Sequence, residues 1–256
     1  MFAPLVRIGA CGPAELAFTP WAFATLLMGD RPLLDAISAS ARPIIPDFTS
    51  SEMCATAWSV SRLLRLDFPL MSAIAAASRT RLFAFNLQEL SNTAGSFAKL
   101  LLIPAPLLDA TSSAALARLS EFSSGDLVGM AWAFAKRGVC DEPLIEAISA
   151  ASIPMLNLFE SQQLAGPAWA FAKLALLDAP LLESISSAAI AMISELSALS
   201  LSRTSWAFAT LVLEAEPLLK AIAAESLPKI AHFTPQNNSL TAWSFSRMMM
   251  CDEPMR

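Results

Sequence analysis

The chain has 256 residues, of which 55% are hydrophobic and 15% charged, and its formal net charge is −5. This apolar content indicates extensive burial, yet no stretch reaches the roughly 18 uninterrupted apolar residues of a membrane-spanning helix. A net negative charge is also unlike a typical nucleic-acid-binding domain, which is basic as a whole.

A fixed period of 37 residues organises the whole chain. Gly95 fills the one vacant position in a tryptophan series made of Trp21, Trp58, Trp132, Trp169, Trp206 and Trp243. A proline series keeps the same step: Pro32, Pro69, Pro106, Pro143, Pro180, Pro217 and Pro254. Such periods mark solenoids, whose repeats stack because none buries its own apolar face. We therefore predict an all-α fold, an α-α superhelical solenoid of 37-residue helix-turn-helix repeats.

The predicted array spans residues 1–256 as a single domain, with six full repeats and the first helix of a seventh. We number positions in each repeat from the tryptophan position, called slot 0, so slot 0 is residue 21, 58, 95, 132, 169, 206 or 243. The seventh repeat lacks its second helix, and a solenoid normally ends in a polar capping repeat. We therefore expect the sequence to be a fragment of a longer protein or an incomplete gene model.

The first helix of each repeat is predicted from about slot −8 to about slot +8. Slots −9 and −6 carry the residue types of a capping box, in which the side chain of each residue accepts a hydrogen bond from the backbone N–H of the other. These pairs are Thr49 and Glu52, Asn86 and Glu89, and Ser123 and Asp126.

The second helix begins at an Asp-x-Pro step, since Asp caps a helix and Pro is tolerated in its first turn. These aspartates are Asp30, Asp67, Asp141, Asp178 and Asp252. In the fourth repeat the helix runs from Pro143 to Ala151. An aromatic column at slot +27 marks its end, with only Leu196 departing from phenylalanine.

A helical wheel places Phe at slot +2 and Leu at slots +5 and −5 on one buried stripe. The tryptophans lie about half a turn away, and we interpret them mainly as packing residues, with base stacking as the alternative.

No residue pattern predicts an enzyme. The chain lacks phosphate-binding glycine loops and nucleophile elbows, and it contains a single histidine, His232. Four dispersed cysteines predict a reducing compartment rather than disulfides or a zinc site. We expect no catalytic residues, metal, cofactor, membrane contact or small-molecule substrate.

Slot +4 is the strongest candidate binding position, because five of its seven residues are basic in a chain with only 17 Lys and Arg. They are Arg62, Lys99, Lys136, Lys173 and Arg247, and the other two residues are Thr25 and Thr210. Slot −3 lies on the same narrow face and supplies Asn92 and Arg203. Repeated helices would align these nine residues along one surface, although any helical repeat also duplicates a solvated lysine.

The phrase Leu-Ser-Asn-Thr-Ala-(Trp)-Ala-Phe-Ala-Lys-Leu, followed by Asp-x-Pro-Leu-Leu, resembles two related kinds of helical repeat. One is the octotricopeptide repeat, and the other is the RNA-editing substrate-binding complex subunit 6 type domain, related to repeats of FAST-kinase-like, RAP-domain-associated proteins. The period of 37, the absence of a RAP-like segment and Gly95 depart from the octotricopeptide pattern.

This resemblance implies a non-catalytic protein that binds single-stranded RNA in organellar RNA processing, stability, editing or translation. Its partners would be RNA and other protein subunits of an RNA-processing complex, and its location the mitochondrion or plastid. Residues Met1 to Ala14 contain one arginine and show no clear targeting peptide. The alternative is a HEAT- or armadillo-like protein-protein interaction scaffold.

Overall fold

The computed structural model describes residues 8, 10–101 and 105–251, without the side chains of residues 105 and 249–251. Asp252 and Pro254 of the predicted series lie outside these residues. The described residues form thirteen α-helices, which are the six predicted pairs and the predicted first helix of a seventh repeat, and they contain no strand. The prediction of an all-α helical-repeat solenoid is therefore confirmed.

The first helix of each repeat is called an A helix. In chain order the A helices are α1 (Pro13–Thr25), α3 (Ser50–Arg62), α5 (Leu87–Leu100), α7 (Ser124–Arg137), α9 (Ser161–Lys173), α11 (Ala198–Thr210) and α13 (Pro235–Cys251). The second helices, called B helices, are α2 (Arg31–Ala41), α4 (Phe68–Arg79), α6 (Ala105–Leu116), α8 (Glu142–Ser152), α10 (Ala179–Ala191) and α12 (Glu216–Lys229). A short 3-10 segment follows each B helix: η2 (Arg42–Asp47), η3 (Leu82–Ala84), η4 (Leu119–Glu121), η5 (Ile153–Leu158), η6 (Ile193–Glu195) and η7 (Ile230–His232).

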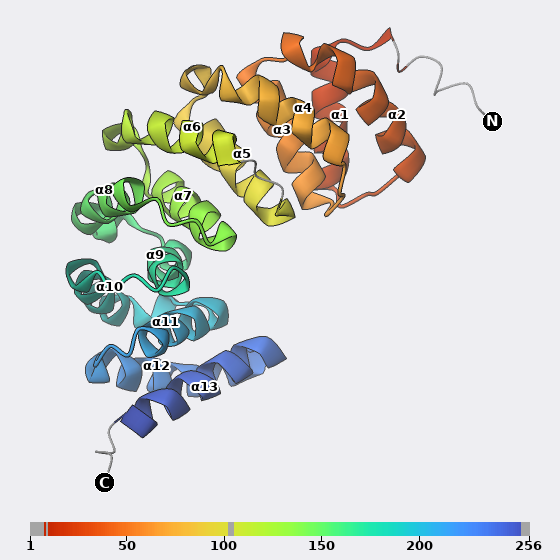
Figure 1. Cartoon of the computed structure of the whole chain (residues 1–256). Helices are drawn as coiled ribbons and strands as arrows, with labels where there is room; N and C mark the ends of the chain where they lie inside the picture. The colour runs from red at the N-terminus through yellow and green to blue at the C-terminus, as the bar shows by residue number, and fades with distance from the viewer. Residues whose placement is uncertain (1–7, 9, 102–104, 252–256) are drawn as a thin grey trace. The chain divides into compact units, whose positions relative to one another are not determined.

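The chain divides into two compact units, and Figure 1 labels the helices of each. Unit 1 is Met1–Glu121 and contains α1 to α6, and unit 2 is Phe122–Arg256 and contains α7 to α13. In unit 1 the A helices pack in the order α1, α3 and α5, and the B helices in the order α2, α4 and α6.

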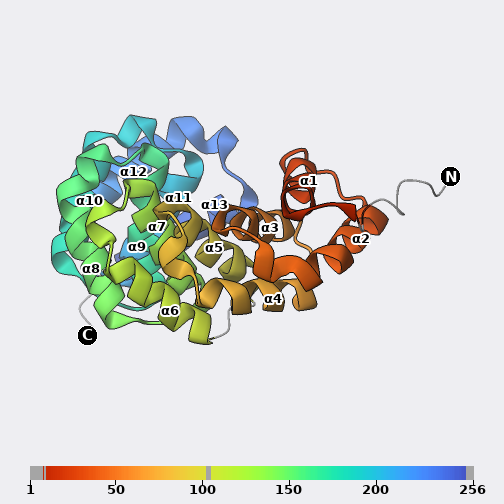
Figure 2. The same ribbon diagram turned by 90° about the horizontal axis from the view of Figure 1, so that it is seen from above.

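Unit 2 repeats this two-layer arrangement. Its A helices pack in the order α7, α9, α11 and α13, and its B helices in the order α8, α10 and α12. Figure 2 shows these layers from above, with α8 and α10 to the left of α7 and α9. In both units neighbouring A helices contact each other more extensively than neighbouring B helices do.

The predicted helix starts are confirmed by side-chain hydrogen bonds. Complete capping boxes begin α3 at Thr49, α5 at Asn86 and α7 at Ser123. The side chains of Asp30, Asp67, Asp141 and Asp178 accept from backbone N–H groups at the starts of their B helices. Each cap satisfies a donor that the first helical turn leaves without a partner.

The first six A helices end three or four residues earlier than slot +8, whereas α13 ends at slot +8 as predicted. The first six stop at slot +4 or +5 because the residue at slot +6 adopts the left-handed conformation in each of the first six repeats. In α3, for example, Arg65 N–H donates to the Val60 carbonyl and Leu64 N–H to the Ser61 carbonyl. This is a Schellman-type ending, in which glycine is the residue normally favoured at the left-handed position. Only one of the six left-handed residues is glycine: Leu27, Leu64, Leu101, Gly138, Ala175 and Val212.

The core lies between the A and B layers and follows the predicted stripe for most of its length. The slot +2 phenylalanines of α5, α7, α9 and α11 are at most 2% exposed: Phe97, Phe134, Phe171 and Phe208. Slot −5 is buried from Leu16 to Leu201. Slot +5 departs from the prediction, because only Leu100 is buried there among the described residues. Leu26 is 69% exposed, and the remaining slot +5 residues are half-buried: Leu63, Arg137, Leu174, Leu211 and Met248.

Candidate nucleic-acid interface

One face of every A helix points away from the B layer. It consists of slots −7, −3, 0 and +4, which are spaced by four, three and four residues and therefore lie one above another on a helix. We call these residues the A face. All seven residues at slot −7 are exposed, slot −3 and slot 0 are half-buried in most repeats, and slot +4 is exposed in all repeats but one.

The basic residues predicted at slot +4 reach solvent from neighbouring A helices. In unit 1, Arg62 and Lys99 are exposed on α3 and α5. In unit 2, Lys136, Lys173 and Arg247 are exposed on α7, α9 and α13. Arg62 and Lys99 of unit 1 lie on directly packed helices, and so do Lys136 and Lys173 of unit 2. In unit 2, α11 with Thr210 at slot +4 separates α9 from α13 and its Arg247.

The two slot +4 arginines contact the tryptophan one turn before them. The guanidinium carbon of Arg62 lies 5.7 Å from the Trp58 ring centroid, and that of Arg247 lies 5.4 Å from the Trp243 centroid. Such cation–π pairs hold the guanidinium over the indole. Arg247 is fixed further, because its Nε donates a 2.9 Å hydrogen bond to the carbonyl of Ala209 on α11.

The four remaining predicted residues have different surroundings. Asn92 is exposed on α5, whereas Arg203 is half-buried on α11, where burial lowers the pKa of its guanidinium. Thr25 donates its hydroxyl to the Trp21 carbonyl at 2.8 Å, so that proton is already used inside α1. The Thr210 hydroxyl is buried without a hydrogen-bond partner among the residues described, so it does not face solvent.

Ion pairing separates the A-face cations from several other basic residues. Among the residues with described side chains, four basic residues pair with carboxylates: Arg65, Arg118, Lys220 and Lys229. None of the four lies on the A face. Within the part of the chain that the structure describes, no carboxylate forms an ion pair with any of the six A-face cations: Arg62, Lys99, Lys136, Lys173, Arg203 and Arg247.

Acidic residues are absent from the A face in all seven repeats, although the chain has 22 of them. Sequence reasoning recognised slots −3 and +4 but missed slot −7, which adds exposed amides at Gln88, Gln162 and Gln236. The signal was available, because slot −7 is one helical turn before slot −3. Because the acidic residues lie outside the A face, a chain of net charge −5 can present positive charge there.

An acidic groove of about 510 Å³ lies elsewhere in unit 2. Glu142 and Glu146 of α8 line it together with Asp178, the N-cap of α10. Negative charge is therefore concentrated where the B helices begin, consistent with the role of acidic side chains at helix N-termini.

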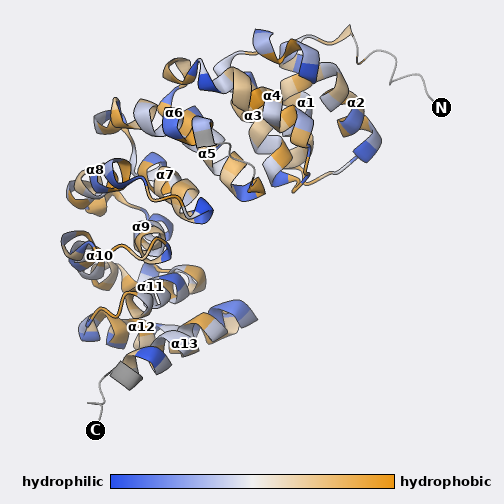
Figure 3. Cartoon of the chain, in the orientation of Figure 1, coloured by the Kyte–Doolittle hydropathy of each residue, from blue (hydrophilic) through white to orange (hydrophobic). Residues whose placement is uncertain are grey.

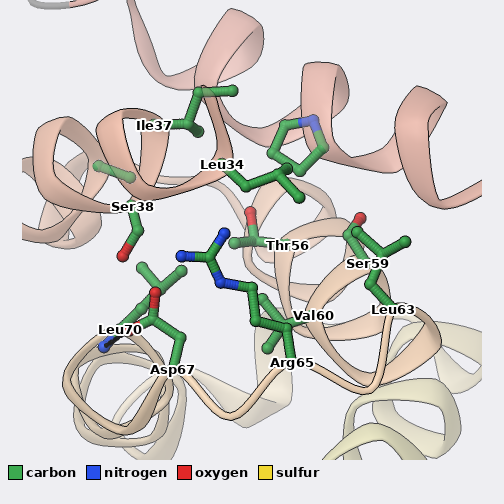
Figure 4. Close-up of a pocket in the computed structure, with 12 residues that line it drawn as sticks. Leu34, Ile37, Ser38, Thr56, Ser59, Val60, Leu63, Arg65, Asp67 and Leu70 are labelled. Carbon is green, nitrogen blue, oxygen red and sulfur yellow. Dashed lines mark hydrogen bonds between the residues drawn. The ribbon is translucent and has the colours of Figure 1, made fainter. Parts of the chain in front are cut away.

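Unit 1 contains a small pocket between α1, α2, α3 and α4 (Figure 4). Arg65 crosses it among apolar side chains such as Leu34 and Val60, and its Nη2 donates to the Asp35 carboxylate. The free volume is about 20 Å³. This volume holds roughly one water molecule, so the pocket is an interior gap rather than a ligand site.

The tryptophans are less buried than a packing column requires. Trp58, Trp132, Trp169 and Trp206 are half-buried, while Trp21 and Trp243 are 46% and 42% exposed. The packing interpretation therefore holds only in part. Five of the six tryptophans have an A-face cation one helical turn away on the same helix, and the exception is Trp21, whose helix has Phe18 and Thr25 at slots −3 and +4.

The described part of the chain has neither a cluster of metal ligands nor a helix that could span a membrane. No three His, Cys, Asp or Glu side chains there come together as metal ligands would. No helix there is both long and apolar enough to cross a membrane, and polar residues interrupt the apolar ones along the helices (Figure 3).

Comparison with protein families gives one match. Residues 110–255 match the family described as RNA-editing substrate-binding complex 6 protein. Comparison of the chain with curated proteins gives no match. The matched segment covers more than half of the chain and includes every helix of unit 2. The chain therefore belongs to the RNA-editing substrate-binding complex 6 family.

Proposed function

We propose that this chain is a non-catalytic subunit of an RNA-editing complex that binds single-stranded RNA along its A faces. The family is named for a protein of an RNA-editing substrate-binding complex, which supports a role beside RNA and other protein subunits. An RNA-editing role also supports the mitochondrion as the location.

One observation carries the RNA part of the proposal. The A face has no acidic residue in any repeat, and its six cations have no ion-pair partner among the described side chains. Exposed phosphates are the ligands that such a row attracts, and the exposed amides at slots −7 and −3 can read base edges. At one nucleotide per repeat, the footprint would be about six or seven nucleotides.

The test is fluorescence anisotropy of the purified chain with a labelled pool of random single-stranded RNA at several salt concentrations. The variant Lys136→Gln/Lys173→Gln removes two A-face charges from unit 2. We expect weaker binding and a salt slope, log K against log salt, reduced by roughly 1.4, because each phosphate contact contributes about 0.7 for single strands.

The matched control is Arg79→Gln/Lys220→Gln, which removes the same net charge from exposed positions on B helices. It should leave affinity and slope nearly unchanged. Equal losses in both variants would show that overall charge, not the A face, governs binding. No binding by the intact chain would reject the RNA proposal.

A protein-binding scaffold is the second candidate, favoured by exposed leucines in unit 1. Leu27, Leu64 and Leu101 occupy slot +6 of successive repeats and are 67%, 69% and 58% exposed. Binding of an apolar partner there would be almost insensitive to salt, unlike binding of RNA.

A further inference from the structure

The A face of unit 2 offers indole rings as well as charge. Trp132, Trp169 and Trp206 lie at slot 0 of α7, α9 and α11, which pack directly against one another in that order. Their half-burial contrasts with the slot +2 phenylalanines of the same helices, which are at most 2% exposed. The larger aromatic ring thus occupies the position that reaches solvent.

The indole N–H groups are also available. No tryptophan side chain in the described part of the chain makes a hydrogen bond to another residue. A buried indole N–H normally finds a partner, so these donors face solvent or a ligand.

Each of the three rings has an uncompensated cation one helical turn away. Lys136 follows Trp132 by four residues, Lys173 follows Trp169 by four, and Arg203 precedes Trp206 by three. Residues at these spacings have Cβ atoms about 5–6 Å apart. A planar base on the ring and a phosphate at the cation can therefore belong to the same short segment of one strand.

The ring faces of these three residues are not occupied by a guanidinium. Among the described contacts, the two cation–π pairs involve Trp58 with Arg62 and Trp243 with Arg247. Those pairs show that the slot 0 rings accept a flat cationic group on their faces. In α7 and α9 the slot +4 residue is a lysine that does not cover the ring.

We propose that Trp132, Trp169 and Trp206 stack against bases of a bound single strand while Lys136, Lys173 and Arg203 bind its phosphates. This inference rests on the proposed RNA-binding function and adds the bases as a second source of affinity. Aromatic stacking tolerates any base, so it contributes affinity with little sequence preference.

The experiment compares two fluorescently labelled strands of equal length and charge, an oligouridine and the same backbone with abasic sites. The intact chain should bind oligouridine at least about tenfold more tightly, since each stacked base contributes on the order of tenfold. In parallel, unlabelled oligouridine should quench the intrinsic emission. The chain has six Trp and no Tyr, so this emission reports on tryptophan.

The variant Trp132→Leu/Trp169→Leu should lose most of the preference for oligouridine while binding the abasic strand as before. The matched control is Trp21→Leu, the same substitution at a slot 0 whose helix has Thr25 rather than a cation at slot +4. It should retain the preference. Circular dichroism checks that each variant folds, and the wild-type comparison needs no substitution at all.

The outcomes separate the two proposals. Equal affinity for both strands without quenching, together with weaker binding by Lys136→Gln/Lys173→Gln, would overturn stacking and leave the RNA-binding face intact. Failure of the intact chain to bind either strand would overturn both.

Discussion

Gly166 of α9 faces Val128 of α7 so closely that a Cβ on Gly166 would lie 2.5 Å from Val128 Cγ1. Real Cβ atoms do not approach a carbon so closely, so the missing side chain sets the spacing of these A helices. The slot −3 glycine therefore has a packing role next to the candidate interface. Its neighbours Trp169 and Lys173 depend on this spacing for their positions.

Substitution Gly166→Ala should destabilise unit 2 by about 1–3 kcal/mol, the usual cost of overpacking. Urea unfolding monitored by circular dichroism measures the change. Gly125→Ala is the control, because its nearest side-chain atom would lie 3.5 Å away, and it should be neutral or slightly stabilising. Adding Val128→Ala to Gly166→Ala should restore part of the loss. Equal effects at both glycines would refute the packing role.

The left-handed residues that end the A helices store strain at exposed positions. Leu64 has φ of 50° and is 69% exposed, so its side chain gains little burial in return. Leu64→Gly should stabilise unit 1 by about 1 kcal/mol, because a left-handed residue with a Cβ costs roughly 1–2 kcal/mol.

Two matched substitutions check this strain. Gly138→Ala, at φ of 67°, should lose about 1 kcal/mol. Leu66→Gly changes a leucine that is 71% exposed but does not have positive φ, so glycine there should be neutral or destabilising. Melting temperatures that fall in Leu64→Gly as in Leu66→Gly would show that strain is not the governing effect.

Lys229 joins two neighbouring repeats of unit 2 through backbone carbonyls. Its Nζ donates to the carbonyls of Ser194 and Leu196 at 2.6 and 2.9 Å, and it also pairs with Glu225. Arg118 has the equivalent position in unit 1 and donates to the Phe85 carbonyl at 2.7 Å. Both basic residues occupy slot +23, and Leu196 and Phe85 both occupy slot +27 of the preceding repeat.

Lys229→Met should therefore destabilise unit 2 by about 1.5–3 kcal/mol, the range for hydrogen bonds to a charged group. Lys220→Met on the same helix is the control. The side chains of Lys220 and its ion-pair partner Glu216 are each 76% exposed, so this pair should contribute little to stability. Chemical denaturation gives both values. A Lys229 variant as stable as the Lys220 variant would mean that the carbonyl contacts contribute nothing.

The repeat period was sufficient to predict the fold class, the pairing of helices and their N-terminal caps, because each depends on local residue types at fixed spacing. The ends of the first six A helices were predicted too late, because five of their six left-handed residues are leucine, alanine or valine and carry no turn signal in the sequence. The division into two compact units depends on contacts over many residues, which a regular period does not reveal.

The candidate site was predictable only as residue types on a helical face. A wheel identified the cations of slot +4, but it could not show that Arg247 bonds to the Ala209 carbonyl or that the Thr210 hydroxyl is buried. Those facts depend on how neighbouring A helices pack. The half-burial of the tryptophans is likewise a property of the stacked repeats.

Because of Cys54 on α3, the free energy of unfolding of unit 1 should fall as the pH rises into the alkaline range. Burial, the largest effect, and the charge of Glu89 raise the pKa of its thiol to about 11, while Thr93 acts in the opposite direction. In the unfolded chain the thiol ionises near pH 9. Its contribution to the free energy of unfolding is therefore complete below pH 9 and is lost between pH 9 and 11. The loss should total roughly 3 kcal/mol.

Urea unfolding of wild type and Cys54→Ala across this pH range measures the loss, and the excess stability of wild type over Cys54→Ala should shrink as the pH rises. Parallel losses in the two proteins would show that other groups govern the alkaline transition.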